Sequence, residues 1–81
     1  MSYGPVTLWA FEEAPEEYRK LSPHGGDEDW IIFVPQTWAP ILSISEDHLP
    51  DCLPFDRGRF GCCSVSRRDV TGGFVFIGAH A

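Results

Sequence analysis

Histidine and cysteine side chains are the first candidates for chemistry in this 81-residue chain. The set comprises His24, His48, His80, Cys52, Cys62 and Cys63. Structural zinc sites usually draw on local ligand pairs separated by two to four residues, and no two of these cysteines have that spacing. His48 and Cys52 would share one face of a helix, with Cys62 or His80 completing a site. A metal centre at His48, Cys52, Cys62 and His80 is therefore an alternative, and the main prediction includes no cofactor.

Cysteine catalysis requires a thiolate beside a base or a helix N-terminus. Cys62 or Cys63 with His80 or His24 would supply the atoms, but nothing in their spacing brings them together. The chain contains no nucleophile elbow, phosphate loop or metalloprotease helix motif. We therefore predict that the protein is not an enzyme, and that one cysteine fills the core while its neighbour faces a helix or solvent.

Acidic residues are concentrated in the first part of the chain. Ten of the twelve lie within the first 51 positions, where Arg19 and Lys20 are the only Arg or Lys residues. We expect these acids to converge on a face that docks on a basic protein surface and occupies a groove built for nucleic acid. The predicted contact residues are Glu12, Glu13, Glu16, Glu17, Asp27, Glu28 and Asp29, with Trp38 as an exposed anchor. Alternatively, these acids stabilise a helix start, pair with Lys20 or decorate a solvated loop.

The formal net charge of −6 disfavours direct binding to DNA or RNA, which requires a basic face. The predicted partner is therefore a host protein or protein complex with a basic surface. Four later cations, Arg57, Arg59, Arg67 and Arg68, either pair with the acidic residues or form a second contact surface. A further alternative is a homodimeric structural or accessory protein in which residues 74–77 lie at a sheet edge and pair with a second copy.

These residues have to be positioned by an α+β domain. Residues 6–11 are apolar with β-branched and aromatic members, which predicts a strand. Pro15 begins a short helix that stops at residues 22–23. Residues 24–29 then form a loop, because paired glycines and three consecutive acids suit neither helix nor strand. Residues 30–34 are the most apolar run, which predicts a central strand buried on both faces.

Residues 36–59 give conflicting signals. A short helix with Pro40 near its first turn is favoured, but the alternation at residues 41–45 equally suits an edge strand. Residues 61–66 and 73–78 predict an antiparallel hairpin joined by residues 67–72. The expected fold is a single small domain over residues 1–81, with a three- to four-stranded, largely antiparallel sheet and one or two short helices on one face.

The composition also suggests where the protein resides. No apolar run approaches the ~20 residues that span a bilayer, and the N-terminus lacks a charged and then apolar leader. An odd set of three cysteines, two of them adjacent, favours a reducing cytosol over a secreted disulfide scaffold. We therefore expect a soluble, cytoplasmic protein.

Two stretches of the chain resemble a known group. EAPEEYRKLSPHGGDEDWIIFVP at residues 13–35 and FGCCSVSRRDVTGGFVFIGAHA at residues 60–81 resemble small uncharacterised proteins encoded by phages and prophages. The resemblance covers a little over half of the chain, through the HGGDEDW and FGCC elements and the IGAHA ending. It implies no catalytic residue. In size, charge and lack of catalytic motifs the chain is similar to phage inhibitors of host defence, including anti-CRISPR proteins, which implies action in the cytoplasm of a bacterial host.

Overall fold

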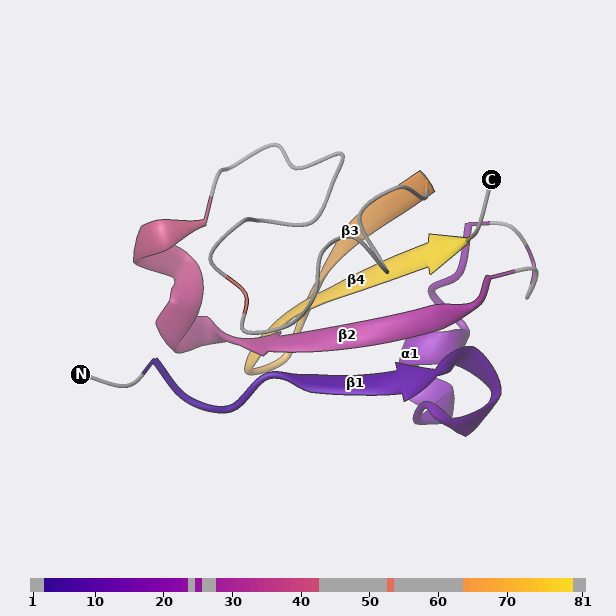
Figure 1. The fold of residues 1–81 in the computed structure, drawn as a ribbon, viewed down its shortest axis with the longest axis horizontal. Coiled ribbons are helices and arrows are strands. Elements are labelled where there is room, and N and C mark those ends of the chain that lie inside the picture. Colours follow the sequence, from indigo (N-terminus) through magenta and orange to yellow (C-terminus); the bar gives the residue numbers. More distant parts are fainter. Residues whose placement is uncertain (1–2, 24, 26–27, 43–52, 54–63, 80–81) are drawn as a thin grey trace.

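The computed structural model describes residues 3–23, 25, 28–42, 53 and 64–79 (Figure 1). Four antiparallel strands form one sheet in the order β1-β2-β4-β3, accompanied by short helical segments. The strands are β1 (Thr7–Ala10), β2 (Trp30–Pro35), β3 (Ser64–Val70) and β4 (Gly73–Ala79). The helical segments are the 3₁₀ helices η1 (Phe11–Glu13) and η2 (Gln36–Ile41) and the α-helix α1 (Glu16–Arg19). The predicted small α+β fold is confirmed.

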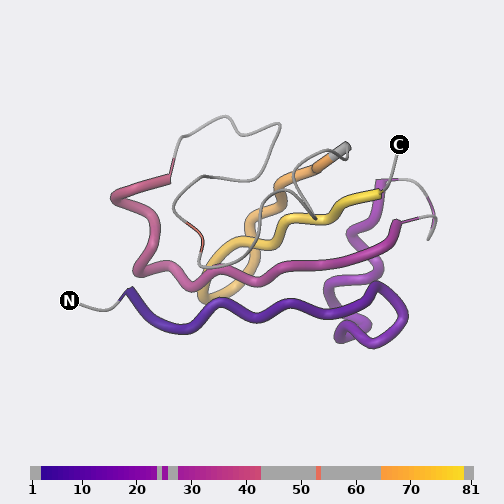
Figure 2. Tube along the Cα trace, in the orientation of Figure 1, coloured from indigo at the N-terminus to yellow at the C-terminus, as the bar shows by residue number. Residues whose placement is uncertain are grey.

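The two most apolar strands, β2 and β4, lie in the interior of the sheet (Figure 2). The side chains of Ile31, Ile32, Val34, Val75 and Phe76 are fully buried, because these strands have a neighbour on each side and packing on each face. The predicted central strand at residues 30–34 is therefore confirmed. Because β4 is paired on both sides, residues 74–77 do not lie at a sheet edge, and the alternative of a homodimer formed by edge pairing of that strand is wrong.

Each face of the sheet carries its own hydrophobic core. On one face, alternate residues of β2 and β4 pack against Trp38 of η2 and against Leu53. On the other face, Ile31 and its β4 neighbours pack against Ala14, with Trp9 and Tyr18 around them. Successive residues of a strand point to opposite faces, so the continuous apolar sequence of β2 requires cover on both. The expectation that the helices occupy a single face is corrected accordingly.

The hairpin of β3 and β4 is longer than expected. Residues 67–70 belong to β3, and the connection is reduced to Thr71 and Gly72. Gly72 has a φ of +86°, which lies in the left-handed region that favours glycine. The predicted first strand began at residue 61, but residues 61–63 lie outside the described part of the chain. The consequence is that the Arg-Arg-Asp sequence of this hairpin lies on an edge strand instead of in a loop.

The segment after β2 is only partly described. η2 includes Pro40 and ends at Ile41, and the next residue, Leu42, is extended with a φ of −97° and a ψ of 141°. The chain is therefore helical around Pro40, but the helix is a 3₁₀ helix that begins at Gln36, so Pro40 lies near its end and not in its first turn as predicted. The proposed continuation through residues 43–49 lies outside the described residues, as does most of the alternative edge strand at residues 41–45.

Candidate partner-binding surface

The acidic residues of η1 and Asp29, which are far apart in sequence, meet at one end of the sheet. β1 ends at Ala10 and runs directly into η1, whereas β2 begins at Trp30, the pairing partner of Ala10. The backbone N–H of Phe11 donates to the carbonyl oxygen of Asp29, with 3.0 Å between the two atoms. This hydrogen bond extends the antiparallel pairing by one residue and fixes Asp29 beside the start of η1. η1 therefore lies beside the start of β2, at the end of the sheet where β1 ends (Figure 1).

α1 presents its acids to solvent because its aromatic residue faces the sheet. Pro15 precedes the helix, and its carbonyl oxygen accepts hydrogen bonds from the N–H groups of Tyr18 and Arg19. The ring of Tyr18 stacks on Phe33, with centroids 5.8 Å apart and planes 11° apart. It also lies 5.8 Å from the ring of Trp9. This anchoring leaves the two glutamates of the first turn exposed.

The environment of Tyr18 favours its neutral form. Burial raises the pKa of the phenol above its ordinary value of 10.0, and the negative charge of Glu17 raises it further. A tyrosine that stays protonated adds no charge to this end of the sheet. The negative charge there comes from carboxylates alone.

Five carboxylates at this end of the sheet are exposed, and we call them the acidic end. They belong to Glu12, Glu13, Glu16, Glu17 and Asp29. Two cations follow on α1 and just after it: Arg19 is half-buried and Lys20 is exposed. Together with Phe11, Glu16, Ser22 and Gly25, they line a pocket of about 370 Å³. The acidic end is therefore flanked by a small positively charged border.

Glu28 does not belong to the exposed acidic end. Only 6% of its surface is exposed, and its carboxylate accepts a hydrogen bond from the hydroxyl of Ser22. A buried carboxylate is tolerated where such donors compensate for lost hydration. The expectation that Glu28 contacts a partner is thereby corrected, because its side chain faces the protein. Asp27, the residue before it, lies outside the described residues.

Trp38 is not an exposed anchor. It is only 8% exposed and belongs to the core on its face of the sheet. Its indole N–H donates to the carbonyl oxygen of Gly4 at 3.1 Å, and its ring lies 5.5 Å from that of Tyr3. The hydroxyl of Thr37 also donates to the carbonyl oxygen of Tyr3. Trp38 therefore fastens the N-terminal segment to η2, which corrects its assignment to the partner-binding surface.

The proposed metal ligands cannot be placed. His48, Cys52, Cys62 and His80 all lie outside the described residues, as do His24 and Cys63. Within the described part of the chain, no group of three or more His, Cys, Asp or Glu side chains is arranged to hold a metal ion. Metal binding at those four residues remains a prediction from the sequence.

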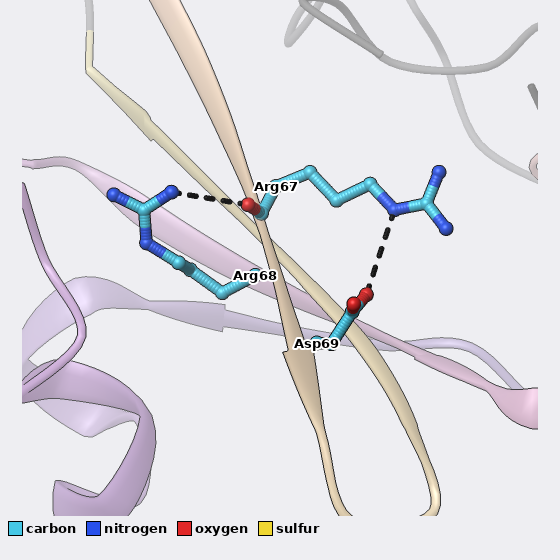
Figure 3. Close-up of polar contacts among 3 residues, drawn as sticks. All are labelled: Arg67, Arg68 and Asp69. Atoms are coloured by element: carbon cyan, nitrogen blue, oxygen red, sulfur yellow. Dashed lines mark hydrogen bonds and ion pairs between the residues drawn. The ribbon is translucent and has the colours of Figure 1, made fainter. Parts of the chain in front are cut away.

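The described cations of β3 interact within the hairpin. The guanidinium of Arg67 lies 4.4 Å from the centre of the Phe74 ring, and its Nε lies 4.0 Å from a carboxylate oxygen of Asp69. Arg68 extends to the opposite side of the strand and donates to the carbonyl oxygen of Arg67 (Figure 3). None of these three contacts involves the acidic end. Arg57 and Arg59 lie outside the described residues.

Comparison with known proteins adds no relative. A scan against protein-family models, a search of curated proteins and a search of solved structures found no match to this chain. Among the described residues, no helix has the length and apolar character needed to cross a membrane.

Proposed function

We propose that this chain is a binding protein whose acidic end docks on a basic surface of another protein. The observation that carries the proposal is the convergence of five exposed carboxylates from η1, from α1 and from Asp29, the residue before β2. Surface charge of one sign steers encounter with the opposite sign and selects partners more than it contributes raw affinity. The sheet holds the backbone of these acidic residues in place, so little backbone has to become ordered when a partner binds.

The basic surface that we propose as the target is one that normally holds nucleic acid. Such surfaces are lined by Lys and Arg side chains that neutralise phosphates, and carboxylates can satisfy the same cations. The net charge of −6 makes the chain itself a poor ligand for DNA or RNA. Occupying the groove would exclude nucleic acid, so the chain would act as a stoichiometric inhibitor.

We propose a phage or prophage origin and an anti-CRISPR-type target in the bacterial cytoplasm. The support is the sequence resemblance at residues 13–35 and 60–81, together with the small size and acidity of the chain. Residues 13–35 include α1 and all of β2, and they contribute four of the five carboxylates of the acidic end. The resemblance and the charged surface therefore overlap in the same part of the protein.

Competition with nucleic acid tests this function. The full chain would be titrated into a panel of purified CRISPR effector complexes, with target-DNA binding and cleavage measured in each. We expect one complex to lose DNA binding at stoichiometric inhibitor, with the inhibition weakening from about 0.1 M to about 1 M salt as the Debye length falls from about 10 Å to about 3 Å. Failure to bind any complex, or binding that leaves DNA occupancy unchanged, would contradict the proposed inhibition.

A further inference from the structure

The outer edge of β1 carries backbone groups that no strand of the described sheet pairs. Two backbone hydrogen bonds show which residues of β2 bond to each neighbouring strand. The Phe11 N–H donates to the Asp29 carbonyl oxygen on the β1 side, and the Gln36 N–H donates to the Gly72 carbonyl oxygen on the β4 side. Odd-numbered residues of β2 exchange hydrogen bonds with β1, and even-numbered ones exchange them with β4. On β1, Thr7 and Trp9 therefore pair with β2. Because the alternation continues along β1, the N–H and C=O groups of Leu8 point away from β2.

The side chains of β1 do nothing to prevent another strand from pairing there. Leu8 is 42% exposed, and Thr7 and Ala10 are exposed as well. The sequence contains no charged residue before Glu12. Natural edge strands usually resist pairing through charged side chains, proline or bulges. The opposite edge, β3, follows that rule, since Arg67, Arg68 and Asp69 occupy consecutive positions along it (Figure 3).

We propose that β1 pairs with β1 of a second copy about a two-fold axis at Leu8. Opposed residues of two antiparallel strands point their side chains to the same face of the sheet, and successive residues alternate between faces. In a pair of identical strands, each face therefore continues from one copy to the other only when the two opposed residue numbers add up to an even number. Centring the axis on Leu8 opposes Leu8 to Leu8 of the partner, Thr7 to Trp9 and Val6 to Ala10. It also uses the longest available stretch before η1 begins. The two sheets then form one continuous antiparallel sheet, and the exposed Leu8 side chains cover each other.

The charge distribution favours a second copy over an unrelated strand. Each copy carries −6, and antiparallel pairing places the two acidic ends at opposite ends of the β1 pair. Parallel addition of the same strand would bring the acidic ends together, which costs electrostatic energy. β1 has no charged side chain that would favour an unrelated strand over others. A second β1 has the same length and places its own Leu8 against the exposed Leu8 of the first copy. This inference is independent of the proposed function.

Mass and amide exchange of the full chain test the dimer. We expect the solution mass to rise from 9.1 kDa toward twice that value over the micromolar range. In the dimer, the Leu8 amide becomes protected from hydrogen exchange. The Trp9 amide, which pairs with Ile31, is protected in both states and serves as the internal reference. A mass of 9.1 kDa into the millimolar range, or a fast-exchanging Leu8 amide at dimer concentrations, would overturn the proposal.

Leu8→Lys is the matching variant, because it opposes two like charges at the two-fold axis. We expect it to raise the dissociation constant of the dimer by about tenfold or more. Ile41→Lys is the control, since Ile41 is 40% exposed but lies on η2, away from the β1 edge. It should leave the dimer unchanged. A Leu8→Lys protein that remains folded and equally dimeric would exclude β1 as the interface, and the wild-type exchange measurement decides the case if that variant fails to fold.

Discussion

The backbone N–H of Phe11 donates a hydrogen bond to the carbonyl oxygen of Asp29, and this contact holds the acidic residues of η1 beside Asp29. Eighteen positions separate these residues in sequence, yet they oppose each other as the next pair after Ala10 and Trp30. The carboxylates of η1, α1 and Asp29 consequently lie at one end of a rigid sheet. These carboxylates are grouped because the register of β1 and β2 brings them together, and not only because the first part of the sequence is rich in acids.

Lys20→Gln should strengthen binding to a basic partner. Lys20 is exposed and borders the acidic end, so its ammonium group repels the cations that the carboxylates attract. We expect the affinity to rise about two- to fivefold, as removing one exposed like charge contributes up to about 1 kcal/mol. Titration calorimetry of both proteins measures the change. A weaker complex would mean that Lys20 contacts an acidic group of the partner.

Glu28→Gln should change stability and leave partner binding unaltered. The side chain is buried and receives the Ser22 hydroxyl, so it offers no charge to a docking surface. Ser22→Ala removes that donor and should lower the free energy of unfolding by about 1–3 kcal/mol. Urea denaturation measures the stability effect, and affinity is measured in parallel at a temperature where the variants are folded. A marked loss of affinity in folded Glu28→Gln would show that this carboxylate does reach the partner.

Much of the fold follows from the sequence because its apolar runs are unambiguous. Residues 30–34 and 73–78 have no charged member and form the two interior strands. Because Arg67, Arg68 and Asp69 are typical of a loop, the sequence predicts a longer hairpin connection than the structure has. On an edge strand, however, Arg67 and Asp69 share one face, where the Arg67 guanidinium covers Phe74. An edge strand that carries charged residues is therefore predicted as a loop when only its composition is considered.

The candidate site was only partly predictable, since burial of polar groups depends on distant partners. Glu28 lies between two acids and has the local pattern of a solvated loop, but the Ser22 hydroxyl makes its burial tolerable. Trp38 lies between a threonine and Ala39-Pro40, yet the acceptor for its indole N–H is Gly4, far away in sequence. Neither of these hydrogen-bonding groups can be inferred from the residues adjacent in sequence.

Gly78→Ala should destabilise the sheet strongly. Gly78 pairs with Trp30 across β4 and β2, and a Cβ atom at this position would lie 2.0 Å from the indole ring. The tryptophan would have to leave its core position, so we expect a loss of about 2 kcal/mol or more in the free energy of unfolding. Thr71→Ala, in the exposed turn of the same hairpin, is the control and should change stability by less than about 0.5 kcal/mol. Near-equal denaturation midpoints for the two variants would contradict the packing described for Trp30.

Stability should fall at alkaline pH because of Tyr18. Its pKa is raised in the folded protein by burial and then by Glu17, so the unfolded chain releases the phenolic proton first as the pH increases. The stabilising contribution is complete below about pH 10 and is lost as the pH rises through the folded-state pKa. Tyr18→Phe should reduce this loss when the free energy of unfolding is compared at about pH 8 and about pH 11. An identical alkaline loss in wild type and Tyr18→Phe would assign the effect to other groups.

The affinity of a variant lacking the acidic end tests the central claim most directly. The variant changes Glu12, Glu13, Glu16 and Glu17 to Gln and Asp29 to Asn. Its control is Asp69→Asn, which neutralises an 83% exposed carboxylate near the opposite end of the sheet. With an effector complex identified in the competition assay, we expect the five-residue variant to bind about fiftyfold more weakly, at about 0.5 kcal/mol per carboxylate. Asp69→Asn should bind like wild type. Equal affinity of the folded five-residue variant and the wild-type protein would contradict docking through the acidic end.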